Sequence, residues 1–290
     1  MRRFTHFAAL DWSGARGLRQ PGIALAVASG GEAPILVRPG HVWSRAEILA
    51  WLEAVAVSGD DILIGVDFSA AFAFVDEGAY FPEWTDSPVD IPELWALVER
   101  LARNDPHYEP GGFLAHPEAR RHFRHGHGDV GDLFAPGTGR LRVVEQHQRT
   151  TKQAASVSNF NLVGAAQVGK ASLSGMRLLH RLRGRIPLWP LDPIPVRGPL
   201  LVEIYTSLAA RAAGIPAGRS KIRDGEALDT ALAILGSPAT GLRGPVSDHA
   251  SDALLAAAWL RAIASDTAYW TPALLTDTLA KTEGWTFGII

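Results

Sequence analysis

The chain has 290 residues, of which 47% are hydrophobic and 20% are charged, a composition that excludes a disordered, collagenous or coiled-coil protein. Its 28 basic and 30 acidic residues nearly cancel, so overall charge alone indicates neither nucleic acid nor membrane as a partner. It has no cysteine, which excludes disulfides, thiolate nucleophiles and thiolate metal sites.

No stretch of the sequence predicts targeting or membrane insertion. The first apolar run, residues 7–10, is too short for the core of a signal peptide. The most apolar later stretch, residues 253–264, is interrupted by Arg261 and is far shorter than a membrane span. We therefore expect a single cytoplasmic domain over residues 1–290, with no membrane partner.

Charge is unevenly distributed along the chain. Residues 140–223 carry a net charge of +11, whereas residues 1–139 carry -8 and residues 224–290 carry -5. A basic middle third is compatible with a phosphate-binding face. It is equally compatible with a general preference for arginine, since 24 of the 28 basic residues are Arg.

The first quarter of the chain predicts most of a β-sheet. Apolar runs bounded by turn residues are typical of strands. Ser44 followed by Glu47 is a capping box, which predicts the start of a helix. The expected elements are strands at residues 5–12, 22–28, 34–37 and 62–68 and a helix at residues 44–57.

Residues 76–153 interrupt this pattern with frequent Pro, Gly, Trp and His, and we expect an insertion or cap after the fourth strand. One amphipathic helix is predicted at residues 92–103. Histidines at 116, 122, 125 and 127 could supply zinc ligands, or belong to a solvated loop, and His125 or His127 could act as a general acid. The remaining expected elements are helices at 159–183, 221–235, 247–263 and 272–281 and strands at 200–205 and 285–290.

Carboxylates occur inside apolar segments, where an ionised group is costly unless it is paired or binds a metal. Asp11 ends the first strand, Asp67 ends the fourth, and Glu203 lies late in the strand at 200–205. On a helical wheel, Asp252 and Asp248 share the apolar stripe of the helix at 247–263, and His249 flanks it. Because strand ends and a helix start can converge, we expect one site there.

Clustered carboxylates without thiolates suit Mg²⁺ or Mn²⁺. Two such ions can activate a water and stabilise the leaving oxygen in phosphoryl transfer. The residues therefore indicate a metal-dependent enzyme that acts on phosphate esters. The sequence has no P-loop, no dinucleotide-binding glycine motif and no zinc-protease helix.

The order of these motifs resembles the ribonuclease H-like superfamily. The segment from His249 to Leu255, HASDALL, resembles the last-helix motif of Holliday-junction resolvases. The whole chain more closely resembles an uncharacterised bacterial family of predicted nucleases with that fold. The stretches that carry this resemblance are Leu10–Gly14, Val66–Ser69, Ala166–Lys170, Val202–Tyr205, Ser251–Leu254 and Glu283–Trp285.

The resemblance implies an α/β fold with a mixed sheet of order 3-2-1-4-5, strand 2 antiparallel, and flanking helices. It implies metal ligands at Asp11, Asp67 and Asp252, assisted by His249 or Asp248. Glu203 is an extra acid, which we expect to join the catalytic cluster. The implied activity is that of a nuclease or another phosphodiester hydrolase.

Several polar residues are candidate contacts to a nucleic-acid substrate. The helix at 159–183 carries a stripe of basic residues, Lys170, Arg177 and Arg181. The stripe could follow a phosphate backbone or could simply be a solvated helix face. Gln167 shares a helix face with Lys170. Ser13 and Ser69 lie in the motifs after the first and fourth strands.

Two alternatives remain open at this point. A phosphotransferase or ATPase of the actin-like branch would hold nucleotide phosphates at Asp11 and at the turn that contains Ser13. That branch duplicates the fold, for which 290 residues leave little room. A non-catalytic nucleic-acid-binding protein would retain the acids without using them.

Overall fold

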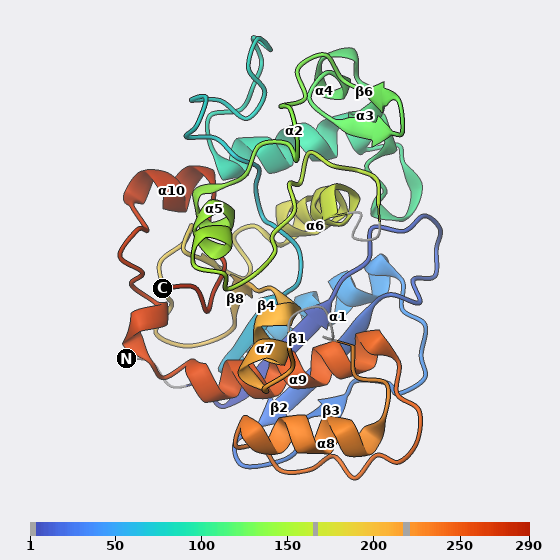
Figure 1. The fold of residues 1–290 in the computed structure, drawn as a ribbon, viewed down its shortest axis with the longest axis vertical. Coiled ribbons are helices and arrows are strands. Elements are labelled where there is room, and N and C mark those ends of the chain that lie inside the picture. The colour runs from blue at the N-terminus through green and yellow to red at the C-terminus, as the bar shows by residue number, and fades with distance from the viewer. Residues whose placement is uncertain (1–3, 165–167, 217–220) are drawn as a thin grey trace.

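The computed structural model describes residues 4–164, 168–216 and 221–290. Its main sheet has six strands in the order β3-β2-β1-β4-β8-β7, with helices on both sides (Figure 1). β2 is antiparallel to β1 and β3, whereas β1, β4, β8 and β7 are parallel to one another. The prediction of a mixed α/β sheet with flanking helices is confirmed. The strands are β1 His6–Asp11, β2 Ala24–Ser29, β3 Ile35–Leu36, β4 Ile62–Val66, β7 Leu188–Trp189 and β8 Leu200–Glu203.

Two hydrophobic cores lie on opposite faces of this sheet. Side chains alternate along β1, so Ala8 and Leu10 join one core while Phe7 and Ala9 join the other. The first core is covered by α1, α2 and α6, and the second by α7, α8, α9 and α10. The bounds of these helices are α1 Arg45–Ser58, α2 Ile91–Ala102, α6 Val168–Leu182, α7 Thr206–Ala212, α8 Gly225–Ile234, α9 Asp248–Ile263 and α10 Asp277–Thr282.

Helix α9 lies close to the sheet because both surfaces are built from small residues. Ala9, Ala26 and Ala28 of the sheet belong to the same core as four alanines of the helix. Ser247 caps the helix, since its hydroxyl accepts a hydrogen bond from the backbone N–H of Ala250. The four alanines of α9 are Ala253, Ala256, Ala257 and Ala258.

The insertion contains more regular structure than its sequence predicted. Helix α2 forms as expected, capped by Asp90, and packs on α6. The other elements were not predicted, because each is short and short elements are marginal without tertiary contacts, such as those of the aromatic cluster that includes Phe72, Phe81 and Phe123. They are η1 Pro106–Tyr108, α3 Gly111–Ala115, α4 Pro117–Arg120, β5 Arg124–Gly126, β6 Asp129–Val130 and α5 Val143–Thr150.

Two predicted elements differ from the structure. The helix expected at 159–183 begins at Val168 among the described residues, and Gly164 before it has a φ of +98°, which is incompatible with a right-handed helix. The expected final strand at 285–290 forms a single bridge, from Thr286 to Glu203, before Gly288 turns the chain at a φ of +96°. The prediction also missed β7, α7 and the short helix η2, Thr267–Tyr269.

In the part of the chain that the structure describes, no helix is both long and apolar enough to cross a membrane.

Candidate functional site

A cavity of about 270 Å³ lies at the carboxyl ends of β1, β4 and β8. Ligand sites of α/β sheets lie at this end of parallel strands. Asp11, Asp67, Glu203, Asp252 and His249 all line the cavity, so the structure brings these five predicted site residues together. Further lining residues are Trp12, Phe68, Ser69, Arg142, Glu145, Gln148, Ser156, Val157, Val168, Ala171, Ile204, Tyr205, Thr206, Lys221 and Thr286.

Asp11 is the last residue of β1 and bonds to the first turn of α9. Its Oδ2 lies 2.7 Å from Nδ1 of His249. This hydrogen bond raises the pKa of His249, although burial opposes the shift. Because Nδ1 is held by the carboxylate, Nε2 of His249 is the ring nitrogen left to exchange a proton with a ligand.

Asp67 directly follows β4, and its backbone N–H donates to the carbonyl of Leu10 at 3.0 Å. The Thr206 hydroxyl donates to Oδ2 of Asp67 at 2.8 Å. Burial, together with the nearby charge of Asp11 and a smaller contribution from Asp252, nevertheless raises the pKa of Asp67 to about 8. Asp67 therefore keeps its proton up to higher pH than an exposed carboxyl group does, because its ionised form is poorly stabilised in the cavity.

Asp252 lies in the second turn of α9 and is 7% exposed. Its Oδ2 accepts a hydrogen bond from Nζ of Lys221 at 2.8 Å. Burial still raises the pKa of Asp252, so the ammonium group offsets only part of the cost of this carboxylate. The pKa of Lys221 is raised despite burial, because Asp252, Asp11 and Asp248 all stabilise its charge.

Asp248 corrects the prediction, since it does not line the cavity. It is the first residue of α9, and both of its carboxylate oxygens accept hydrogen bonds from Arg223, at 2.6 and 2.9 Å. Those bonds lower the pKa of Asp248. The helical wheel correctly places Asp248 one turn before Asp252. That first turn of α9 lies outside the cavity, and the Asp248 side chain pairs there with the exposed Arg223.

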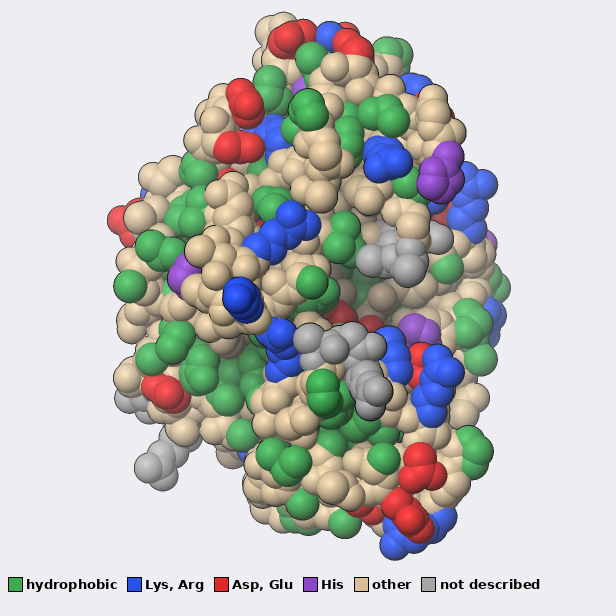
Figure 2. All heavy atoms as spheres, viewed as in Figure 1, with side chains coloured by type: hydrophobic (Ala, Val, Ile, Leu, Met, Phe, Trp, Pro, Cys, Tyr) green, Lys and Arg blue, Asp and Glu red, His purple; other side chains and the backbone are tan. Residues whose placement is uncertain are grey.

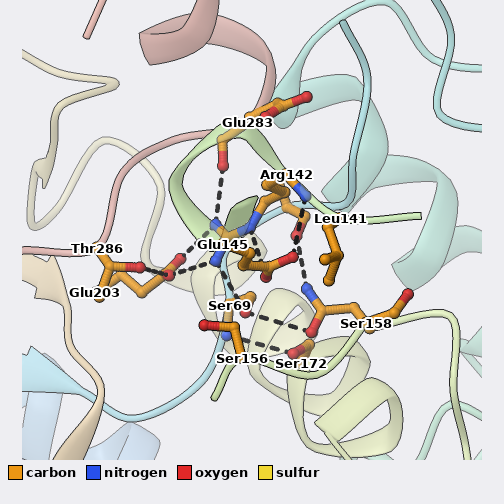
Figure 3. Close-up of polar contacts among 12 residues, drawn as sticks. Ser69, Leu141, Arg142, Glu145, Ser156, Ser158, Ser172, Glu203, Glu283 and Thr286 are labelled. Carbon is orange, nitrogen blue, oxygen red and sulfur yellow. Dashed lines mark hydrogen bonds and ion pairs between the residues drawn. The ribbon is translucent and has the colours of Figure 1, made fainter. Parts of the chain in front are cut away.

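Glu203 also corrects the prediction, because its carboxylate is fully engaged (Figure 3). Arg142 donates two hydrogen bonds to it, at 2.6 and 2.8 Å. The backbone N–H of Ala70 and the hydroxyl of Thr286 donate to the same carboxylate at 2.9 and 2.8 Å. Glu203 thus lies at the cavity as expected, but its carboxylate is paired with Arg142 instead of being left for a ligand.

Arg142 itself is one of the most buried side chains of the protein, at 1% exposure. It also contacts Glu145, the carbonyl of Glu283 and the hydroxyl of Ser69. Burial raises the pKa of Glu145, although Arg142 opposes the shift. Ser69 therefore belongs to this buried network, which borders the cavity, and its hydroxyl accepts from Arg142 (Figure 3).

The predicted basic stripe is not a free surface. Arg177 is buried and donates to Glu99 at 2.7 Å and to the carbonyl of Glu109 at 2.6 Å. Arg181 pairs with the same Glu99. Glu99 of α2 therefore pairs with two of the three basic residues on this face of α6, of which Arg181 stays half-exposed. Sequence alone could not show this.

Two other predicted substrate contacts, Lys170 and Ser13, do not line the cavity. Lys170 is partly buried at the start of α6, and the hydroxyl of Ser13 accepts from the backbone N–H of Ala15 at 3.2 Å. Gln167 lies outside the described residues. Across residues 4–164, 168–216 and 221–290, no group of three or more His, Asp or Glu side chains is arranged to hold a metal ion. This includes the histidines of the insertion.

Sequence reasoning missed Lys221, Thr206 and Arg142. Lys221 was read only as the start of a helix, and Thr206 lay between predicted elements. The spacing of Arg142 and Glu145, three residues apart, was the available signal for a local ion pair. Their role at the cavity depends on tertiary contacts.

Comparison with known proteins gives no assignment: no family model, no curated protein and no solved structure matches this chain.

Proposed function

We propose that the protein is a divalent-metal-dependent hydrolase of phosphodiester bonds, a nuclease with a ribonuclease H-like fold. One observation carries the proposal. Asp11, Asp67 and Asp252, from three separate elements, line one cavity in which the pKa of Asp67 is raised to about 8. Burial and mutual repulsion make it costly for all three acids to ionise together, and a bound cation would remove that cost.

The arrangement of the sheet supports the same proposal. Its first five strands in space follow the order β3-β2-β1-β4-β8, with β2 antiparallel to its neighbours. This order is the one that the resemblance to the ribonuclease H-like superfamily implies. β7 is a two-residue strand that pairs with β8 at the edge of the sheet, and neither of its residues lines the cavity.

The donor set fits Mg²⁺ or Mn²⁺, since hard carboxylate oxygens are the ligands that these ions prefer. No three acids of the described residues are arranged to hold a metal as they stand, so Asp11, Asp67 and Asp252 would have to turn toward a common point to bind the ion. The ion would supply activation of a water and stabilisation of the leaving oxygen. Lys221 at present pairs with Asp252, and we expect its ammonium to move toward a substrate phosphate when a metal takes its place. His249, oriented by Asp11, can hold or release a proton at Nε2.

The direct test is Mn²⁺-dependent cleavage of labelled single-stranded, duplex, hybrid and branched nucleic acids. We expect the parent protein to cut at least one of them. Asp11→Asn should reduce the rate by at least about 100-fold, because a metal ligand and the partner of His249 are lost together.

Asp248→Asn is the matched control, since it makes the same change of an acid to an amide at a residue that does not line the cavity. Its rate should stay within about twofold of the parent rate. Cleavage that survives Asp11→Asn, or no cleavage of any substrate in the panel, contradicts the proposal and favours a non-catalytic binding protein.

A further inference from the structure

A second hollow, of about 390 Å³, lies beside the carboxylate cavity between the end of α5 and α7. Three of the five residues that line it are basic, namely Arg149, Lys152 and Arg211. The other two are alanines, so its lining contains no acid. Figure 2 shows Lys and Arg side chains gathered on the face that carries α5 and α7.

The two arginines are held in place by backbone carbonyl groups. Nη1 of Arg211 donates to the carbonyls of Lys152 and Gln153, and Nε of Arg149 donates to the carbonyl of Ser156 at 2.7 Å. A guanidinium group has five N–H donors, so these bonds fix each side chain and leave further donors for a ligand. Neutral carbonyl partners also leave both positive charges uncompensated, unlike the ion pair between Arg177 and Glu99.

The basic hollow and the carboxylate cavity share their supporting segments. Gln148 and Ser156 line the cavity, while Arg149 and Lys152, between them in sequence, line the hollow. On α7, Thr206 holds Asp67 in the cavity, and Arg211 lies five residues further along the helix. Five residues of helix rise about 7.5 Å, so Arg211 lies close enough to the cavity to contact a phosphate near the one bound there.

We infer that Arg149, Lys152 and Arg211 bind the phosphate backbone of a single nucleic-acid strand whose neighbouring phosphodiester lies in the carboxylate cavity. This inference rests on the proposed function. A ligand that reaches both an acidic metal-type cavity and a basic hollow must present several regularly spaced anionic groups, as a nucleic-acid backbone does. The surface that tracks the strand is thus formed by α5 and α7, not by α6 as predicted.

The test measures binding of a fluorescent single-stranded oligonucleotide by anisotropy, with chelator present so that no cleavage occurs. The variant Arg149→Gln, Lys152→Gln, Arg211→Gln should weaken binding on the order of tenfold at about 50 mM salt. It should also reduce the slope of log affinity against log salt by about 2, since each phosphate contact to a single strand contributes about 0.7.

The matched control is Arg100→Gln, Arg103→Gln, Arg183→Gln, which removes three exposed cations near α2 and the end of α6. Its binding and salt slope should equal those of the parent. Lys152→Gln alone should reduce the slope by about 0.7. This exposed residue provides a test that does not depend on how the segment is anchored.

Three results would overturn the inference: no binding by the parent, equal losses in both triple variants, or equally tight binding of a polyglutamate of the same charge. The cleavage assay tests the proposed function separately. Loss of binding in the first variant without any Mn²⁺-dependent cleavage retains the basic subsite and rejects the nuclease. Mn²⁺-dependent cleavage by the parent, together with unchanged binding in that variant, retains the nuclease and rejects the basic subsite.

Discussion

Three carboxylates in one cavity repel one another, and at residue scale the cost falls mainly on Asp67 and Asp252. Burial and the charge of Asp11 raise the pKa of Asp67, and hydrogen bonds from Thr206 oppose this only in part. Burial likewise raises the pKa of Asp252 in spite of Lys221. Without a bound cation, the folded protein therefore binds protons at these two sites more tightly than the unfolded chain does.

The first prediction concerns the pH dependence of stability in the presence of a chelator. Between the ordinary pKa of 3.8 and about 8, folded Asp67 keeps a proton that the unfolded chain has lost. The free energy of unfolding should therefore fall as pH rises through this window, by at most about 1.4 kcal/mol per pH unit from this group. Asp67→Asn should flatten the dependence.

Urea unfolding of both proteins at a series of pH values measures this effect. His249 also has a raised pKa, so the stability that its proton contributes is likewise lost as pH rises. Because both proteins contain His249, this loss does not account for a difference between their curves. Parallel curves for the parent and Asp67→Asn would show that Asp67 ionises normally in the fold.

The second prediction concerns Asp252. Since its pKa is raised even beside Lys221, Asp252→Asn should leave stability without metal unchanged or slightly increased. It should also remove most of the stabilisation that Mn²⁺ gives the parent. That gain is about 2.7 kcal/mol when the metal concentration is 100 times its dissociation constant.

Thermal melts with chelator and with Mn²⁺ measure both effects, and Asp248→Asn is again the matched control. A purely structural Asp252 would give the opposite result. Its replacement would lower stability by about 1 kcal/mol, and Mn²⁺ would change neither protein.

The acids of the cavity could be predicted from sequence, but their partners could not. Asp11, Asp67 and Glu203 stand out because they end apolar runs, and Asp252 because it interrupts an apolar helix face. Whether such an acid faces a ligand or an arginine depends on residues far away in sequence. Glu203 and Arg142, separated by 61 positions, illustrate this limit.

At the scale of elements, α5 is fastened to the sheet by buried charge. Arg142 precedes the helix and joins Glu203 of β8 to the carbonyl of Glu283 near the C-terminus. The Glu283 carboxylate in turn accepts hydrogen bonds from the backbone N–H groups of Phe74, Val75 and Val143. These contacts fix the insertion relative to the cavity, so α5 forms part of its wall.

The third prediction follows from that arrangement. Arg142→Met should lower the free energy of unfolding by about 3–5 kcal/mol, because it leaves buried Glu203 without its counter-charge. The control is Arg185→Met, which breaks the exposed pair with Glu53 and should cost about 1 kcal/mol or less. Urea denaturation measures both, and equal small losses would show that the Arg142 network contributes little.

The glycines of α6 illustrate why an element can be predicted without its packing. In sequence they only weaken a helix. In the structure, a Cβ at Gly175 would lie 2.3 Å from the ring of Phe68, and one at Gly14 would lie 2.4 Å from the backbone nitrogen of Ala171. Both glycines allow α6 to lie close to the strand ends that carry Asp67 and Asp11. The sequence shows where the glycines are, but not which residues pack against them.

At the scale of the whole molecule, the regional charges seen in sequence are matched across space. The net +11 of residues 140–223 is met by acids from both other regions. Arg181 pairs with Glu99 and Arg185 with Glu53 of the first region, and Lys221 pairs with Asp252 of the last. The sequence predicted the four N-terminal strands and α9 because they are strongly patterned. It failed at β7 and at the bridge from Thr286 to Glu203, which form only against a β8 strand that is already in place.

The bond between Asp11 and His249 spans 238 positions of sequence, and the one between Arg142 and Glu283 spans 141. Contacts this distant carry a large loop-closure entropy and form late in folding. During synthesis, β1 is made long before α9 and the segment around Thr286. His249 and Asp252, in contrast to Asp11 and Asp67, are among the last residues of the cavity to be added. The charged cavity is assembled only at the end, so incomplete chains cannot carry its chemistry.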